Sequence, residues 1–319
     1  MRRQIIKERE DWKSQAEALG FNFHSMYGAA YWFEAACYQF TLRQIEDDIE
    51  DPCNELEQMC FEIVDQAIKK EEMLMKLCIP ENFWDYIRNS WIQKEKNLYG
   101  RFDFSYNGKS PAKLLEYNAD TPTALYESAV FQWIWLEQAI EANIIPGGCD
   151  QFNSLHERLV EAFKNFGIGS KLHLTSCKGY EEDEATVRYL EECAIQAGIE
   201  TNFIYLEDIG QDDAGALVDL DDEDILTLFK LYPWEWLVKD EFSAGVRNTE
   251  IQVIEPAWKM ILSNKGLLAL LWDNFENHPN LLPAFFTGDP RAAGFTNNYV
   301  KKPLFSREGA NVEIVTCDG

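Results

Sequence analysis

Two short runs of the sequence could gather polar side chains on one face of a hairpin. Residues 101–104 read RFDF and residues 114–120 read LLEYNAD, with the turn-rich NGKSP between them. Because strand side chains alternate between faces, Arg101 shares a face with Asp103, and Glu116 shares a face with Asn118. With Asp103 opposite Glu116, these four residues form one cluster, although a slip of one residue destroys it. The opposite face is then apolar. Its members are Phe102, Phe104, Leu115 and Tyr117.

Two carboxylates that face each other repel, so such a hairpin requires a cation. Arg101 supplies part of the positive charge. A divalent ion suits the cluster better, because Asp, Glu and an Asn carbonyl are hard oxygen ligands of the kind that Mg²⁺ takes, and Mg²⁺ usually shares its coordination sphere with water and phosphate. The cluster therefore suggests a metal and nucleotide site. The alternative is a solvated polar face, as on other antiparallel sheets with one wet side.

Two further segments carry positive charge. The run KKPLFSREGANV (301–312) predicts a basic strand, a small loop and a second strand, and a loop with Gly309 lets backbone N–H groups approach phosphate oxygens closely. Lys302 and Arg307 lie beside that loop. It is not a P-loop, since G-x-x-x-x-G-K-[ST] is absent. An ordinary hairpin turn with surface charges is the alternative. Lys265, in SNKGLLALLW, reads as a solvated lysine when taken alone.

The elements that must position these residues form an α/β pattern. Residues 40–77 have helical periodicity that Pro52 interrupts, which predicts two helices or one kinked helix. Helices are also expected at 80–96, 126–141, 153–166 and 259–272, and after the acidic run that begins at residue 219. Residues 171–177, 181–198 and 201–209 predict a β-α-β unit with parallel strands. Further strands are expected at 299–305 and 311–315.

Size and charge exclude several classes of protein. The 319 residues suffice for one large or two ordinary domains, and 46% of them are apolar, which is typical of a folded chain. The net charge of −26 lacks the basic footprint of a nucleic-acid-binding protein but suits a cationic substrate such as a polyamine. No run approaches the roughly 20 apolar residues of a membrane span, and the N-terminus lacks a signal-peptide core.

The cysteines and the absence of an export signal predict a cytoplasmic protein. The eight cysteines are scattered and show no C-x-x-C spacing, which favours reduced thiols over a zinc site or a disulfide framework.

These segments together resemble one family, the synthetase domain of glutathionylspermidine synthase and trypanothione synthetase, and in particular its stand-alone bacterial acid–amine ligases. The resemblance spans most of the chain in the expected order. The segments that carry it are 40–50, 99–104, 114–128, 131–137, 262–272, 278–286 and 299–312. It implies an ATP-grasp-like fold of the α/β class with some α+β character. It also implies a ligase that joins a carboxylate to an amine through an acyl phosphate, with ATP and Mg²⁺.

The resemblance also assigns roles to residues. It implies that Asp103, Glu116 and Asn118 bind Mg²⁺. Arg101 is similar to the residue that holds the transferring phosphoryl group and the acyl group, and Lys265 and Lys302 are similar to ligands of the ATP phosphates. The loop 306–311 resembles the one that closes over the nucleotide, with Arg307 reaching the transition state. That loop consists of Ser306, Arg307, Glu308, Gly309, Ala310 and Asn311.

The partners implied are a small carboxylic acid or peptide and an amine, of which a polyamine is one candidate. The run GYEEDEAT (179–186) could form an amine-side acidic cluster, or it could only complement the dipole of the helix that it begins. No nucleic acid or membrane partner is expected.

We expect one synthetase domain over residues 1–319, with an α/β subdomain inserted at about 150–240 and no preceding amidase domain. We also expect that domain to be short at its C-terminus, where relatives contribute part of the adenine pocket. A second function therefore stays open: a catalytically inactive or truncated relative that binds nucleotide weakly or serves as an interaction module.

Overall fold

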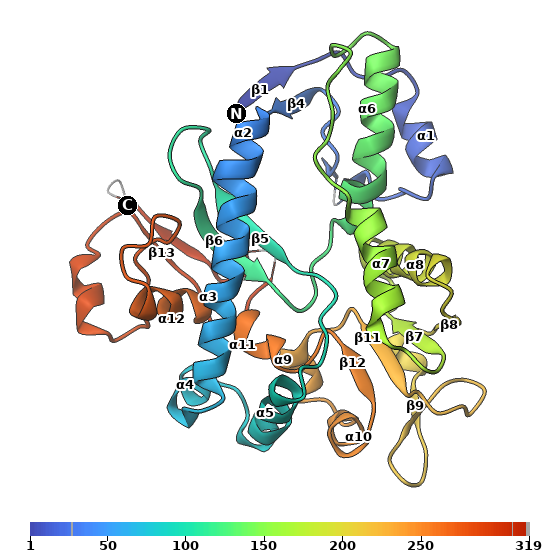
Figure 1. Ribbon diagram of the computed structural model, residues 1–319, viewed down its shortest axis with the longest axis vertical. Helices are drawn as coiled ribbons and strands as arrows, with labels where there is room; N and C mark the ends of the chain where they lie inside the picture. The colour runs from blue at the N-terminus through green and yellow to red at the C-terminus, as the bar shows by residue number, and fades with distance from the viewer. Residues whose placement is uncertain (27, 308, 317–319) are drawn as a thin grey trace. The chain divides into compact units, whose positions relative to one another are not determined.

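The protein is described here by a computed structural model that covers residues 1–26, 28–307 and 309–316 (Figure 1). Its chain packs into two compact units, each built from three segments. The first unit comprises residues 1–45, 121–232 and 244–254, and the second comprises residues 46–120, 233–243 and 255–319. The expectation of one synthetase domain with an insertion at about 150–240 stays a prediction.

The first unit is built around a parallel sheet of four strands in the order β12-β11-β7-β8. β7 (Leu172–Thr175), α8 (Glu181–Gln196) and β8 (Thr201–Phe203) form the predicted β-α-β unit, which confirms the α/β class. β11 (Thr227–Lys230) lies between β7 and β12 (Gln252–Ile254) and is parallel to both. The predicted helix after the acidic run is confirmed only at its end, in α9 (Trp234–Leu237), because residues 227–230 form β11 instead. All four residues of β11 are buried, so the sheet overrides the charge of Lys230.

The other elements of the first unit are short strands and helices. They are β1 (Arg2–Ile5), α1 (Trp12–Ala18), β2 (Ser25–Met26), β3 (Ala29–Ala30), β4 (Ala36–Gln39), α2 (Leu42–Ile45), the π-helical η3 (Glu127–Phe131), α6 (Gln132–Glu141), α7 (Leu155–Phe166), η4 (Leu206–Asp208), β9 (Gly210–Gln211), β10 (Leu217–Val218) and α10 (Ser243–Asn248, all but its first residue). α7 packs on α8, and the predicted helices at 126–141 and 153–166 are confirmed to within a few residues.

The second unit carries the predicted hairpin and the helices that support it. Its elements are the π-helical η1 (Glu46–Glu50), α3 (Asp51–Ala67), α4 (Glu71–Lys76), η2 (Glu81–Phe83), α5 (Trp84–Ile92), β5 (Arg101–Ser105), β6 (Lys113–Asn118), α9 (Trp234–Leu237), α11 (Lys259–Leu262), α12 (Leu267–Asn274), η5 (Pro290–Gly294), β13 (Tyr299–Lys301) and β14 (Glu313–Val315).

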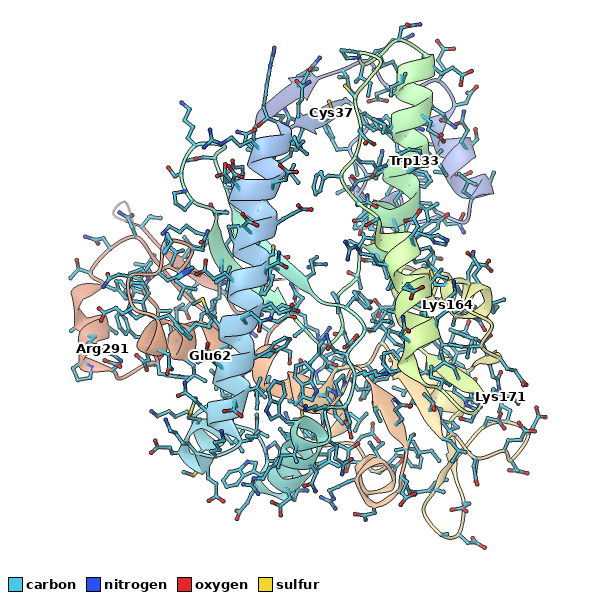
Figure 2. All side chains as sticks on the ribbon, in the orientation of Figure 1. Cys37, Glu62, Trp133, Lys164, Lys171 and Arg291 are labelled. Atoms are coloured by element: carbon cyan, nitrogen blue, oxygen red, sulfur yellow. The ribbon has the colours of Figure 1, made fainter. Side chains whose placement is uncertain are left out.

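α3 shows why this part of the chain is helical. It buries one stripe, which includes Leu56, Ile63 and Val64, and leaves Glu62 in solvent on its outer face (Figure 2). Pro52 lies in its first turn, directly after the π-helical turn, so the predicted interruption of the helix is confirmed. α3 packs on α11 and α12, which are two helices where one was predicted.

Smaller expectations can also be compared with the structure. β13 and β14 pair antiparallel, as expected, but β13 ends at Lys301, earlier than predicted. The seven cysteines in the described part of the chain are free thiols. Within those same residues, no helix is long and apolar enough to cross a membrane.

Candidate active site

The hairpin of β5 and β6 has the register that the sequence predicts. Arg101 lies opposite Asn118, and Asp103 lies opposite Glu116, so the four polar side chains share one face. On the other face the rings of Phe102 and Tyr117 stack with centroids 4.1 Å apart. The alternation of polar and apolar residues therefore fixed the pairing of these two strands.

A β-bulge corrects the prediction for the turn end of the hairpin. The register shifts between Asp103 and Phe104, so that Phe104 lies opposite Leu114 and Leu115 becomes the extra residue. Leu114 is buried and Leu115 is exposed, the reverse of the expected apolar face. The carbonyl oxygen of Leu115 accepts a hydrogen bond of 2.9 Å from Nζ of Lys302. The bulge thus brings a predicted phosphate ligand to the hairpin.

Each of the two opposed carboxylates has its own cation. Nε of Arg101 donates to Asp103 at 2.9 Å, and the amide of Asn118 donates to the other oxygen of Asp103 at 3.2 Å. Nζ of Lys265 lies 3.0 Å from Oε1 of Glu116. Arg101 and Lys265 thus provide the positive charge that two facing carboxylates require, and the binding of Mg²⁺ by this cluster stays a prediction.

Lys265 connects the hairpin to the predicted loop. Its Nζ also donates to the carbonyl oxygen of Ser306 at 2.8 Å, and its backbone N–H donates to the carbonyl oxygen of Leu304 at 2.9 Å. The side chain is 9% exposed, whereas that of Glu116 is 27% exposed. The default interpretation of Lys265 as a solvated surface lysine is wrong.

A tight turn between α11 and α12 holds Lys265 in place. Asn264 is buried; its amide donates to the carbonyl oxygen of Leu77 at 2.8 Å, and its Oδ1 accepts the N–H of Gly266 at 2.8 Å. A Cβ atom on Gly266 would lie 2.7 Å from Leu77, so the turn requires glycine there. This turn divides the single helix that was expected at 259–272.

Lys302 lies in the field of the same charges. Burial lowers the pKa of its amine, and the positive charge of Lys265 acts in the same direction, against the carboxylates of Glu116 and Asp103. Lys302 thus interacts with the charges of the hairpin cluster, and its role as a ligand of the ATP phosphates stays a prediction.

The remaining loop residues are partly described. The Ser306 hydroxyl is buried and makes no hydrogen bond within the described residues. The guanidinium of Arg307 lies 3.6 Å from Glu235 and 5.3 Å from the ring centroid of Trp236, both on α9. Gly309 and Asn311 have positive φ angles, and the N–H of Ala310 donates to the carbonyl oxygen of Arg307, which makes a turn. Glu308 lies outside the described residues.

The segment HPNLL (278–282), named above only for its resemblance, anchors the start of β6. Asn280 is buried; its carbonyl oxygen accepts the N–H of Leu114 at 2.8 Å and its amide donates to the carbonyl oxygen of Ala112 at 2.8 Å. Nζ of Lys113 donates to the carbonyl oxygens of Pro279 and Leu281. Sequence patterns do not reveal this support, because the two segments are far apart in the chain.

The acidic run at 179–186 lies in the first unit, at the start of α8. Glu182 accepts a hydrogen bond of 3.1 Å from the hydroxyl of Tyr31, which also donates to the buried Glu127 at 2.6 Å. Glu184 accepts a bond of 3.0 Å from Tyr205. Burial, and then Glu127, raise the pKa of Tyr31 well above its usual range. The amine-side role of this run stays a prediction.

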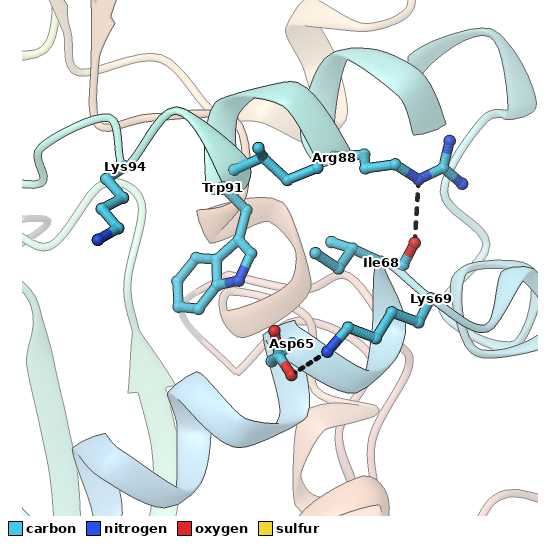
Figure 3. A pocket seen from close by; sticks show the side chains of 7 residues that line it. Asp65, Ile68, Lys69, Arg88, Trp91 and Lys94 are labelled. Carbon is cyan, nitrogen blue, oxygen red and sulfur yellow. Dashed lines mark hydrogen bonds and ion pairs between the residues drawn. The ribbon is translucent and has the colours of Figure 1, made fainter.

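An open hollow of about 540 Å³ lies at the C-terminal ends of α3 and α5 (Figure 3). None of the predicted site residues lines it. Arg88 donates to the carbonyl oxygen of Ile68, Lys69 pairs with Asp65 at 2.5 Å, and Lys94 follows the end of α5. Cations at these positions complement the helix dipoles, so the hollow needs no ligand to explain its charge.

The comparisons with known proteins agree with the resemblance. The sequence matches the family described as glutathionylspermidine synthase preATP-grasp over residues 3–319. The chain belongs to this family. A Haemophilus influenzae protein named "Putative acid--amine ligase" is 43% identical over 320 residues, which cover 95% of this chain and 77% of that protein. The predicted membership is therefore confirmed.

More distant relatives are named synthetases. The bifunctional glutathionylspermidine synthetase/amidase of Escherichia coli is 28% identical over 88% of this chain and 48% of its own length. Trypanothione synthetase of Crithidia fasciculata is 28% identical over 81% of this chain and 43% of its own length. The chain thus spans about half the length of these two relatives. The predicted enzyme class, a ligase, is confirmed by the names of all three.

Among solved structures, a glutathione synthetase-like effector from Globodera pallida has a TM-score of 0.38 and 14% identity, and covers 66% of this chain and 55% of its own.

Proposed function

We propose that this protein is an ATP- and Mg²⁺-dependent ligase that joins a carboxylic acid to an amine through an acyl phosphate. The observation that carries the proposal is the convergence of two distant segments, around Lys265 and at 302–306, on the hairpin. Lys265 bridges Glu116 and the carbonyl oxygen of Ser306, while Lys302 bonds the bulge carbonyl of the same strand. Cations and carboxylates meet there in the mixture that binding of a metal and polyphosphate requires.

The donor set fits Mg²⁺. Asp103, Glu116 and Asn118 offer hard oxygen atoms on one face of two paired strands, and the Asp103 side chain is 41% exposed, so water and phosphate oxygens have access. Within the described residues, no three His, Cys, Asp or Glu side chains are placed to hold a metal, so this set of two acids and one amide stays a prediction. A bound Mg²⁺ supplies charge neutralisation at the transferring phosphoryl group.

The ion pairs of the hairpin indicate which contacts would change when the substrate binds. Asp103 and Glu116 would hold the metal, and Arg101 and Lys265, which now pair with them, would then pair with the phosphate oxygens of the substrate instead. Lys302 already has a lowered pKa, and polyphosphate favours its charged form. These cations hold the γ-phosphoryl group for in-line attack, and this positioning with charge stabilisation supplies most of the rate.

The reaction has two balanced steps. A carboxylate oxygen of the acid attacks the γ-phosphorus and ADP leaves, which forms the acyl phosphate. The amine, as its free base, then attacks the acyl carbon, loses a proton and expels phosphate, which forms the amide. Arg101, beside Asp103 on β5, is placed to hold the acyl and phosphoryl oxygens in both steps. Arg307 closes over the nucleotide when it leaves Glu235.

The substrate class is a small acid or peptide and an amine. The E. coli relative is named for glutathionylspermidine and the C. fasciculata relative for trypanothione. The acidic first turn of α8, with Glu182 at 3.1 Å from the Tyr31 hydroxyl, supports a cationic amine, because it concentrates negative charge beside an exposed surface.

The test is phosphate release from ATP over a panel of acids and amines at millimolar Mg²⁺. We expect turnover that depends on an acid–amine pair, and we expect Asp103→Asn to lower kcat by roughly 10²-fold or more while the protein stays folded. Asp85→Asn is a matched control, since Asp85 is an exposed acid of the same unit outside the hairpin. It should retain full activity.

Two outcomes contradict the proposal. Unchanged turnover in Asp103→Asn rules out the metal assignment. The absence of turnover with every pair, together with a melting temperature that millimolar Mg²⁺-ATP does not raise, rules out the ligase and its nucleotide site together. A rise in melting temperature without turnover supports the inactive relative that binds nucleotide.

A further inference from the structure

A buried ion pair lies directly behind the hairpin. The carboxylate of Glu255 and Nζ of Lys259, at the start of α11, are 2.6 Å apart, and both side chains are 0% exposed. In the sequence EPAWK this pair has the i, i+4 spacing of an ordinary exposed helix pair, so the sequence gives no indication that it is buried. A charged pair taken fully out of water is costly, and an apolar pair of similar volume is often as stable. Stability alone therefore does not account for it.

Apart from the bond to each other, the two side chains make their hydrogen bonds to one short stretch of backbone. The Glu255 carboxylate accepts the N–H of Leu98 at 3.1 Å and the N–H of Tyr99 at 3.0 Å. Nζ of Lys259 donates to the carbonyl oxygen of Tyr99 at 2.6 Å. Residues 95–100 are half-buried or exposed and belong to no helix or strand, so their backbone polar groups have no ladder partners, and these two side chains provide partners instead.

This stretch leads directly into the site. Only Gly100 separates Tyr99 from Arg101, the first residue of β5, and Asp103 follows two residues later. Consecutive Cα atoms are about 3.8 Å apart, so a displacement of Tyr99 has almost no chain length in which to be absorbed. The bonds to both the N–H and the carbonyl oxygen of Tyr99 also fix the rotation of its peptide planes, which sets the face on which Arg101 and Asp103 project.

We propose that Glu255 and Lys259 are positioning residues of the ligase reaction: they hold Leu98 and Tyr99 so that Arg101 and Asp103 keep the geometry that the metal and the phosphoryl group require. This proposal rests on the proposed function. The pair touches neither carboxylate of the hairpin and acts only through the backbone. Its second expected effect, on the rigidity of residues 98–103, does not depend on catalysis.

The test uses the charge-neutral double variant Glu255→Gln/Lys259→Met. The matched control is Arg9→Met/Glu34→Gln, which removes another buried pair, also 2.6 Å apart, from the first unit. We expect hydrogen exchange at the amides of residues 98–103 to accelerate at least tenfold in the double variant and to stay unchanged in the control. In turnover, the double variant should lose at least tenfold in kcat and require several times more Mg²⁺ for half-maximal rate, with little change in KM for the amine. Lys259→Arg, which keeps a charged donor at the same position, should recover part of kcat.

The outcomes separate the two proposals. If the wild-type protein turns over no acid–amine pair, the proposed function fails, and hydrogen exchange still decides whether the pair holds this segment. If the double variant loses only melting temperature, as the control does, and keeps its kcat and Mg²⁺ dependence, the pair is merely structural and the inference is wrong. If the double variant does not fold, Lys259→Met alone is the test, because it removes the bond to the Tyr99 carbonyl oxygen and leaves the two bonds from the N–H groups of Leu98 and Tyr99. This single variant should show the same effects on hydrogen exchange and turnover to a smaller degree. Unchanged kinetics in it overturn the inference.

Discussion

The backbone at Gly100 lies against the ring of Tyr117, and Gly100→Ala tests how tightly the hairpin is packed. An added Cβ would lie 2.7 Å from Cε2 and 2.9 Å from the hydroxyl oxygen of that ring. Ordinary van der Waals contact begins at 3.4 Å, so the ring edge must retreat by 0.7 Å, which is 3.4 Å minus 2.7 Å. Gly100 has no left-handed φ, so the cost is steric and not conformational.

The ring has little room to retreat. Tyr117 is 5% exposed, stacks on Phe102 at 4.1 Å, and lies in the field of Glu57 and Cys60 on α3. Overpacking of this kind costs about 1–3 kcal/mol, which corresponds to a loss of roughly 2–12 °C in melting temperature for a protein of this size class. If the strand moves instead of the ring, Glu116 and Asn118 move with it. A displacement approaching 1 Å at catalytic groups lowers kcat by up to about 10²-fold.

The assay is thermal unfolding together with turnover, and Gly294→Ala is its control. Nothing lies within 4 Å of a Cβ at Gly294, so this variant should be neutral or slightly stabilised. Tyr117→Leu removes the clashing atoms, and in a double-mutant cycle it should recover at least about 1 kcal/mol of the Gly100→Ala cost. If Gly100→Ala melts like the wild-type protein, or if Tyr117→Leu gives no recovery, the close approach does not constrain the hairpin.

Two predictions follow from shifted pKa values. Burial lowers the pKa of Lys302, so its amine loses the charge that favours phosphate as the pH rises through that lowered value. The affinity for ATP should therefore fall at alkaline pH, and Lys302→Arg should keep ATP binding to a higher pH. Identical pH profiles of ATP affinity for the wild-type protein and this variant would disprove the assignment. Burial alone raises the pKa of Asp219, but hydrogen bonds from His173 and from two backbone N–H groups outweigh it and hold the pKa at about 2. Since the pKa of Asp219 in the folded protein lies below that of a free aspartate, its contribution to the free energy of unfolding is present above pH ~4 and is lost as the pH falls toward 2. In urea unfolding, the free energy of unfolding of the wild-type protein should fall more steeply on acidification than that of Asp219→Asn. An equal dependence on pH in the two proteins would argue against the hydrogen bond from His173.

The local order of the hairpin was predictable because its alternating pattern has a period of two and a short turn. The pattern assigns each residue to a face, and the pairing of Asp103 with Glu116, which had to be assumed from the position of the turn, is confirmed. The bulge at Leu115 could not be predicted, because the residue types on the two faces of the hairpin are acceptable with or without one extra residue. β11 was missed since an acidic run precedes it and Lys230 ends it, while its burial depends on strands far away in the sequence.

The partners of the charged residues were the least predictable part of the site. Glu116 and Lys265 are separated by 149 residues, and Leu115 and Lys302 by 187. No local pattern encodes such pairs. The resemblance implies that Lys265 and Lys302 bind the ATP phosphates, but it does not indicate that both contact the hairpin. For the same reason, the i, i+4 spacing of Glu255 and Lys259 gives no indication that they are buried.

The existing ion pairs also bear on the order of binding that the proposed function requires. A metal ion that arrives alone must take Asp103 from Arg101 or Glu116 from Lys265, and it leaves a cation without its partner. Polyphosphate that arrives alone draws those cations away and leaves the carboxylates opposed, which costs free energy. When metal and polyphosphate arrive together, both sets of charges exchange partners and none is left unpaired. These ion pairs therefore predict that the metal–nucleotide complex binds more tightly than either component alone.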